Sequence, residues 1–109
     1  MEINESKQTG KRIIAMTGRL DVASAPEFEE AGLAALAEGD HHIVVDLSKL
    51  VYISSAGLRS ILVVGKKAKA NGGNLSLCGL TGIVKEVFEM SGFDSFFGIY
   101  DDVDQAVEA

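Results

Sequence analysis

The chain has 109 residues, which suits one domain with one hydrophobic core. Its formal net charge of −6 argues against a nucleic-acid-binding surface, which needs a basic face, but permits a basic protein partner. No apolar stretch is long enough to span a membrane and no signal peptide is visible, so we expect a cytoplasmic protein without direct membrane insertion. Cys78 is the only cysteine and lies in an apolar run, so a buried, unreactive thiol is expected.

The first elements predicted along the chain are two short strands, at about residues 3–7 and 13–18. Gln8–Lys11 between them is typical of a hairpin turn, so this first pair should be antiparallel. The next segment predicts the start of a helix, with Ser24 as its cap and Glu27 completing a capping box. Apolar residues then recur at helical spacing.

The apolar run 42–47 predicts a strand that is covered on both faces and ends near Ser48. A turn up to Ile53 would then lead into a second helix that starts near Ser54. The apolar face of this helix should comprise Leu58, Ile61, Leu62 and Gly65.

The second half of the chain repeats the alternation of strand and helix. A strand is expected at 75–78, an amphipathic helix ending near 91–92, a short strand at 96–99 and a last helix at 101–108. The buried positions of the amphipathic helix should be Ile83, Val84, Val87 and Phe88. Such alternation implies parallel strands joined by right-handed crossovers. We therefore predict an α/β fold over residues 1–109, with a mixed sheet of four to five strands flanked by about four helices.

The segment Val44–Leu58 carries the strongest functional signal in the chain. It places Ser54 and Ser55 where a helix begins, and the N–H groups there lack internal partners and carry partial positive charge. A phosphate added to such a hydroxyl would be held by those groups, and Gly57 would leave the backbone accessible to another protein. From the residues alone, the commoner interpretation is that Ser54 is an N-cap and Ser55 a first-turn residue.

The same segment resembles the signature of STAS domains, specifically that of the bacterial anti-sigma factor antagonists. The first block of the signature is matched by Asp46-Leu47-Ser48, and the second by Ser55, Gly57 and Leu58. The family's loop before the first helix is matched by Asp21 with Ser24-Ala25-Pro26. Ser54 stands where an acidic residue often sits, and Ala56 stands where some members carry the phosphorylated serine. Other members read Ser-Ser-Ala-Gly, as this chain does.

The resemblance implies a phosphorylation-switched protein. Its unphosphorylated form would bind an anti-sigma factor that is a serine kinase and so release a sigma factor, and a phosphatase would reset it. The phosphate acceptor would be Ser55, with Ser54 as second choice. The partner-binding residues would be Asp21, Ser24, Asp46, Ser54, Gly57, Leu58 and Arg59. ATP and Mg²⁺ would belong to the kinase, so this chain should need no cofactor.

Three charged residues of this set have alternative interpretations. Asp46 could simply receive backbone N–H groups at a strand end, and Asp21 could simply make a turn; for both, structural and binding roles are about equally expected. Arg59 lies four residues after Ser55 and could reach a phosphate there, although a solvated helix residue is the commoner outcome.

Two other functions were weighed against the switch. A hydrolase would need a base beside the serine, but His41 and His42 are adjacent at a strand start, away from the serines, and form no credible metal site. No nucleophile elbow or phosphate-binding loop is present, since Gly72-Gly73 lacks the required lysine, so no enzyme activity is expected. The alternative is a STAS adaptor subunit of a membrane transport assembly, such as a lipid-transport ABC system, with an unmodified serine.

Overall fold

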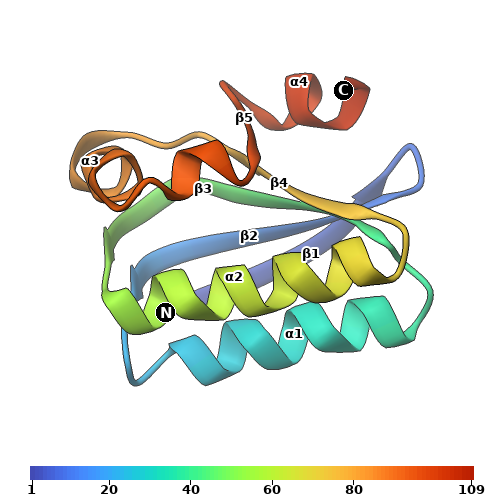
Figure 1. Ribbon diagram of the computed structural model, residues 1–109, viewed down its shortest axis with the longest axis horizontal. Coiled ribbons are helices and arrows are strands. Elements are labelled where there is room, and N and C mark those ends of the chain that lie inside the picture. The colour runs from blue at the N-terminus through green and yellow to red at the C-terminus, as the bar shows by residue number, and fades with distance from the viewer.

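The computed structural model describes residues 1–109 and shows an α/β fold built on one five-stranded sheet (Figure 1). The strands lie in the order β1-β2-β3-β4-β5; β1 and β2 are antiparallel and the other neighbours are parallel. The elements in chain order are β1 (Glu2–Gln8), β2 (Lys11–Leu20), α1 (Ala25–Ala37), β3 (His42–Ile53), α2 (Ser55–Ala70), β4 (Asn74–Cys78), α3 (Gly82–Ser91), a 3₁₀ turn (Phe93–Ser95), β5 (Gly98–Tyr100) and α4 (Val103–Glu108). The predicted fold class is confirmed.

Helices cover both faces of the sheet, which explains why the central strands are apolar at successive positions. In β3, Val45 points into the larger core beneath α1 and α2, whereas Val44 belongs to a smaller cluster beneath α4. Figure 1 shows α1 and α2 side by side on one side of the sheet and α4 on the other. The smaller cluster comprises Ile13, Val44, Cys78, Ala106 and Val107.

The first two strands form the predicted hairpin, with a two-residue turn. Thr9 and Gly10 have φ values of 50° and 79°, and this left-handed pair is the backbone shape that matches the twist of the flanking strands. The register pairs Gln8 with Lys11 and continues to Glu2 opposite Thr17.

Strand β3 is longer than the sequence suggested, because it continues to Ile53 instead of ending near Ser48. Two bulges explain the difference. Between the pairs Ala15↔Asp46 and Thr17↔Lys49, and again just after Gly18↔Leu50, β3 carries one more residue than β2. The polar residues that looked like the end of the strand are therefore a bulge within it.

The last strand and two helix faces also differ from expectation. β5 begins at Gly98 rather than residue 96, because a 3₁₀ turn follows α3 and leaves the Phe96 side chain 69% exposed. In α3, Val84 and Phe88 are buried as predicted, but Ile83 is 51% exposed. In α2, Val64 is fully buried, a position that the predicted face omitted.

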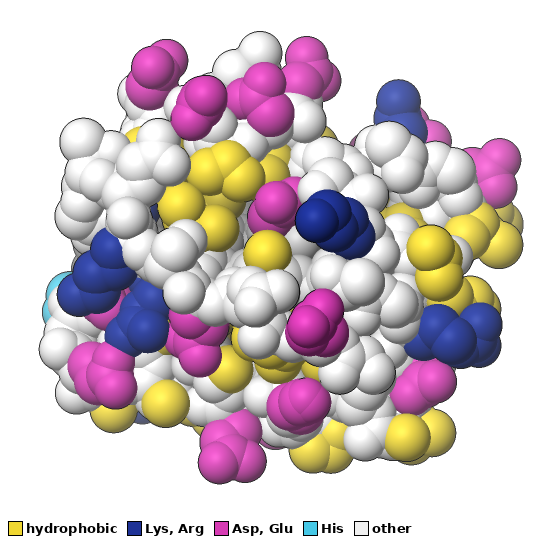
Figure 2. Space-filling model, turned by 180° about the vertical axis from the view of Figure 1, so that it is seen from behind, with side chains coloured by type: hydrophobic (Ala, Val, Ile, Leu, Met, Phe, Trp, Pro, Cys, Tyr) yellow, Lys and Arg dark blue, Asp and Glu magenta, His cyan; other side chains and the backbone are white.

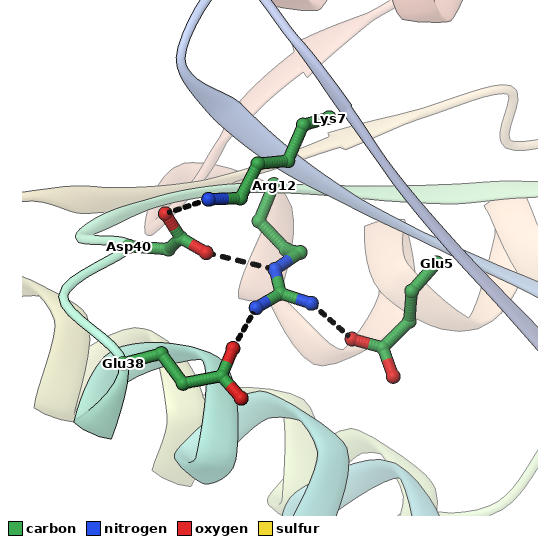
Figure 3. A network of polar contacts seen from close by, with 5 residues as sticks. All are labelled: Glu5, Lys7, Arg12, Glu38 and Asp40. Carbon is green, nitrogen blue, oxygen red and sulfur yellow. Dashed lines mark hydrogen bonds and ion pairs between the residues drawn. The ribbon is translucent and has the colours of Figure 1, made fainter.

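A network of charged side chains joins β1 and β2 to the connection between α1 and β3 (Figure 3). The Arg12 guanidinium donates to Asp40 Oδ2 at 2.9 Å, to Glu5 Oε1 at 3.0 Å, and to Glu38. Lys7 Nζ lies 3.0 Å from Asp40 Oδ1. Burial lowers the pKa of Arg12, but its bonds to Asp40 and Glu38 outweigh that effect and raise it.

The hydrogen bond from Lys7, followed by that from Arg12, lowers the pKa of Asp40 despite partial desolvation. A carboxyl group with a lowered folded-state pKa contributes stability above its unfolded pKa, and the contribution is lost as pH falls through the folded pKa. We expect Asp40→Asn to unfold at lower urea concentration at pH 7, with a difference from wild type that shrinks below about pH 4.

Urea titrations at pH 7, 5 and 3 measure this difference, with Asp94→Asn as the control because Asp94 is exposed and joins no ion pair. A gap between wild type and Asp40→Asn that stays constant from pH 7 to pH 3 would contradict the assignment.

Candidate functional site

The site forms where β2 and β3 end side by side. Leu20 pairs with Ile53 in the parallel register, and the Leu20 carbonyl accepts a hydrogen bond from Ser54 N at 2.9 Å. This contact places the loop at residues 21–24 next to the first turn of α2. Two segments that are far apart in the sequence thus form one edge, at the carboxyl ends of the strands, where sites in such sheets commonly lie.

Gly57 allows the close approach of these two segments. It is buried, and a Cβ at this position would lie 2.6 Å from Leu20 O and 2.9 Å from Leu20 Cγ. The expectation that Gly57 leaves the backbone accessible to another protein is therefore wrong for the free chain. The Leu58 side chain is 7% exposed and packs in the core, so both residues position the site instead of presenting themselves on it.

The two serines have different environments. Ser54 is half-buried and caps α2, since its Oγ accepts from Gly57 N at 3.3 Å, as the N-cap interpretation predicted. Ser55 is the first residue of α2 and is exposed, and its hydroxyl makes no hydrogen bond. Ser55 therefore offers a free hydroxyl at a helix N-terminus, whereas the Ser54 hydroxyl is already engaged.

The loop before α1 is held by hydrogen bonds of Asp21 and Ser24. Asp21 Oδ1 accepts from Ala23 N at 3.1 Å and from Ser24 N at 3.3 Å, and Asp21 N donates to Ser24 Oγ at 2.9 Å. The predicted capping box is wrong: Ser24 has helical backbone angles, and its hydroxyl lies 2.8 Å from Arg19 O instead of capping the helix. The Glu27 side chain makes no hydrogen bond to Ser24.

Asp21 is a fixed negative charge beside the serines. Desolvation raises its pKa, but the bonds from the Ser24 and Ala23 amides outweigh this and lower it. Arg19 Nε lies 3.8 Å from Asp21 Oδ2, and the Arg19 guanidinium stacks 4.2 Å above the Tyr52 ring centroid. The expected turn role of Asp21 is confirmed by the bonds to its Oδ1 atom. Its Oδ2 atom faces Arg19.

The structure separates Asp46 from the other candidate residues. Asp46 lies seven residues before Ile53 in an unbroken strand, about 20 Å away at the rise of a β-strand. Its Oδ1 atom accepts a hydrogen bond from Ser48 N at 3.0 Å. Asp46 therefore binds a backbone N–H group as predicted, but it does so in a bulge within β3 and not at the end of the strand. Arg59 is exposed on the first turns of α2 and joins no ion pair.

Two exposed valines beside the site were missed by the sequence analysis. Val22, in the loop after Asp21, is 76% exposed, and Val51, the extra residue of the second bulge, is 65% exposed. Exposed apolar side chains next to a site commonly mark a protein contact. A valine directly after Asp21 was the available signal, whereas the exposure of Val51 depends on the bulge.

The remaining candidates for chemistry lie elsewhere or are blocked. His42, at the start of β3, contacts Asn74 Oδ1 at 3.2 Å, at the opposite end of the strand from the serines. No cluster of three potential metal-binding residues is formed. Cys78 is fully buried, as expected, and burial, followed by the charges of Asp46 and Asp102, raises its pKa to about 12.

Acidic side chains outnumber basic ones in the sequence, and they are prominent on the surface (Figure 2). Figure 2 shows the side opposite to the view of Figure 1, where acidic side chains are spread over the surface and Lys and Arg side chains stand singly or in small groups among them. That face lacks the continuous basic stripe expected for nucleic-acid binding. None of the helices has both the length and the apolar composition that a membrane span requires.

Comparison with known proteins identifies the family of the chain. The sequence pattern of the STAS domain matches residues 2–106, so the chain belongs to the STAS domain family. BtrV of Bordetella bronchiseptica, provisionally named an anti-sigma factor antagonist, is 38% identical over 109 residues, covering 100% of this chain and 94% of that one. An anti-sigma-B factor antagonist of Staphylococcus epidermidis is 30% identical over 79 residues, covering 72% and 73%. Both of these relatives of the STAS domain carry names of anti-sigma factor antagonists.

Solved structures share the fold. A Thermotoga maritima protein provisionally described as an anti-sigma factor antagonist has a TM-score of 0.91 at 23% identity, covering 97% of this chain and 92% of that one. Phosphorylated SpoIIAA of Bacillus has a TM-score of 0.77 at 18% identity, covering 98% and 97%. A sulfate transporter family protein of Wolinella succinogenes has a TM-score of 0.80 at 17% identity, covering 94% and 86%.

Proposed function

We propose that the chain is an anti-sigma factor antagonist switched by phosphorylation of Ser55. In its unphosphorylated form it binds an anti-sigma factor that is a serine kinase and thereby frees a sigma factor. The observation that carries the proposal is the exposed, unbonded Ser55 hydroxyl at the N-terminus of α2, next to the loop held by Asp21. The names of the relatives support it, and so does the existence of a phosphorylated form of Bacillus SpoIIAA, a protein with the same fold.

In the proposed phosphorylation reaction, this chain contributes only the acceptor hydroxyl. The kinase supplies ATP and Mg²⁺, and the terminal phosphoryl group is transferred to Ser55 Oγ as the hydroxyl proton leaves. The product carries about −1.5 to −2 charge, which the positive end of α2 tolerates in the free protein. Arg59, one turn further along the same helix, would pair with the phosphate in this scheme. A phosphatase then hydrolyses the ester and restores the hydroxyl.

The chain is a substrate and a binding partner in this scheme, with no catalytic role. Its two histidines lie at the other end of β3, so neither can act as a base for Ser54 or Ser55. The partner surface combines Asp21 and the serine turn with the exposed Val22 and Val51. Ser24, Gly57 and Leu58 act through the shape they give this surface.

A constitutive adaptor in a membrane transport assembly is the competing function, and a sulfate transporter family protein of Wolinella succinogenes shares the fold. The adaptor needs no modification of Ser55. The exposed Ser55 hydroxyl is accessible to a kinase, whereas the Ser54 hydroxyl is engaged as the N-cap of α2, and this accessibility is what supports the switch.

Phosphorylation of Ser55 is directly testable. We expect the kinase that co-purifies with the wild-type chain to place one phosphate on Ser55 in the presence of ATP and Mg²⁺, as read by phosphopeptide mapping. Ser54→Ala should still be phosphorylated, because its hydroxyl is the cap and not the acceptor, whereas Ser55→Ala should not. Phosphate found on Ser54 alone, or recovery of transporter subunits in place of a kinase, would contradict the proposal.

A further inference from the structure

A crevice separate from the serine site lies between the C-terminal half of α2 and strands β4 and β5. It encloses about 450 Å³, which is within the range of small-molecule sites. From α2 it receives Leu62, Gly65, Lys66 and Lys69, whose spacing of three and four residues places them on one face of the helix. One helical stripe therefore brings both apolar and cationic side chains to the same opening.

The opposite wall of the crevice is apolar and aromatic. Leu75 of β4 is 4% exposed, whereas Phe96 is 69% exposed and Phe97 is half-buried. The Phe97 ring packs directly on the helix at Gly65, where a Cβ would lie 2.7 Å from its Cε1 atom. An exposed aromatic ring beside a packed one offers a surface on which a second ring can stack.

The charge of this crevice is opposite to that of the whole protein. The net charge is −6, yet none of the 12 residues around the crevice is acidic. Lys66 and Lys69 form none of the ion pairs of the structure, so their charges are not neutralised within the chain. A small anion entering the crevice would meet two cations and no like charge.

A neighbouring crevice of about 390 Å³, near α3 and β5, does not share this property. Three acidic residues, Glu89, Asp94 and Asp101, border it with one cation, Lys85. Size and apolar surface are similar in the two crevices, so the charge of the lining is what distinguishes them. Of these two crevices, only the α2 crevice has a lining of net positive charge.

We propose that the α2 crevice binds a small amphipathic anion, in which a carboxylate, sulfonate or phosphate ester is attached to an aromatic or branched aliphatic group. The acid group pairs with Lys66 and Lys69 at the rim. The apolar group lies against Phe96, Phe97 and Leu75. This site is at the opposite end of α2 from Ser55, and the inference does not depend on the proposed switch.

A pair of matched fluorescent probes tests the proposal on the full chain. The probe 8-anilino-1-naphthalenesulfonate joins aromatic rings to an anion, and N-phenyl-1-naphthylamine has the same rings without the sulfonate. We expect saturable one-to-one binding of the sulfonate and at least fivefold weaker binding of the uncharged probe. Raising the salt from about 0.05 to about 0.5 M should weaken only the sulfonate, because salt screens exposed charges.

Lysine variants place the probe in the crevice. We expect Lys66→Gln and Lys69→Gln each to weaken sulfonate binding by up to about fivefold, and the double variant by about tenfold, without changing binding of the uncharged probe. Lys67→Gln is the control, since Lys67 is exposed on the same helix but does not border the crevice. Unsaturable binding, an unchanged affinity in the double variant, or an equal loss in Lys67→Gln would overturn the proposal. Thermal melts of all variants check that each one is folded at the temperature of the binding measurement.

Discussion

Gly57→Ala is expected to lower the free energy of unfolding by about 2–3 kcal/mol, and the melting temperature by about 10 °C. The added methyl group would lie 2.6 Å from the Leu20 carbonyl oxygen, a backbone atom that also accepts from Ser54 N. Because neither backbone can rotate away, α2 must shift from β2. The gain in helix propensity, about 1 kcal/mol, offsets only part of this cost. Thermal and urea unfolding of the purified protein measure the loss.

Gly65→Ala is the matched control for this prediction. Gly65 is also buried in α2, and its Cβ would meet an atom at 2.7 Å, but that atom is the edge of the half-buried Phe97 ring. A side chain can move where a backbone carbonyl cannot, and alanine favours the helix, so stability should change by less than about 1 kcal/mol. Equal losses in the two variants would show that helix–strand approach at Leu20 is not the constraint.

Ser55→Asp is expected to bind the kinase partner at least tenfold more weakly than wild type, while its melting temperature stays close to that of wild type. In the free protein the new carboxylate lies at an exposed helix N-terminus, which favours an anion by about 0.3–1 kcal/mol. In the complex the same charge is desolvated against a surface that had accepted a hydroxyl, and such burial commonly costs several kcal/mol. A loss of about 1.4 kcal/mol already gives the tenfold change.

Two variants control for charge and for loss of the hydroxyl. Thr81→Asp adds a carboxylate at the N-cap of α3, an exposed helix start in a different part of the chain, and should leave the affinity unchanged. Ser55→Ala should bind as wild type does and resist inactivation by the kinase with ATP. Calorimetric titration reads the affinities. A similar weakening in Thr81→Asp would point to overall charge, and a large loss of stability in Ser55→Asp would make Ser55 a structural residue.

Local chemistry determined which features could be read from the sequence. The hairpin turn and the Ser54 cap depend on neighbouring residues only, and both were predicted correctly. The cap at Ser24 was wrong because Asp21, three residues earlier, binds the same amide and hydroxyl groups. The Ser24 hydroxyl is directed toward Asp21 and Arg19 and away from the first amides of the helix, and the sequence does not tell which of these partners prevails.

Long-range packing explains the remaining errors. The two bulges of β3 are defined against β2, so the apolar pattern of β3 alone did not reveal them, and Asp46 was placed at a strand end that does not exist. The role of Gly57 depends on its distance from Leu20, and the α2 crevice depends on Phe97 meeting Gly65. Such contacts between distant segments leave no periodic signal in the sequence.

One face of the sheet is covered by the short helix α4, and the single thiol, Cys78, lies beneath it. Reaction of this thiol can therefore report when α4 opens. Helix α4 has six residues and shields Cys78 mainly through Ala106 and Val107. Short terminal elements with few buried contacts are the first to open from a folded protein. Whenever α4 detaches, Cys78 loses the burial that keeps its thiol protonated, and becomes open to alkylation. The rate at which this thiol is modified therefore counts the openings of the C-terminal helix, on the face of the sheet opposite to α1 and α2.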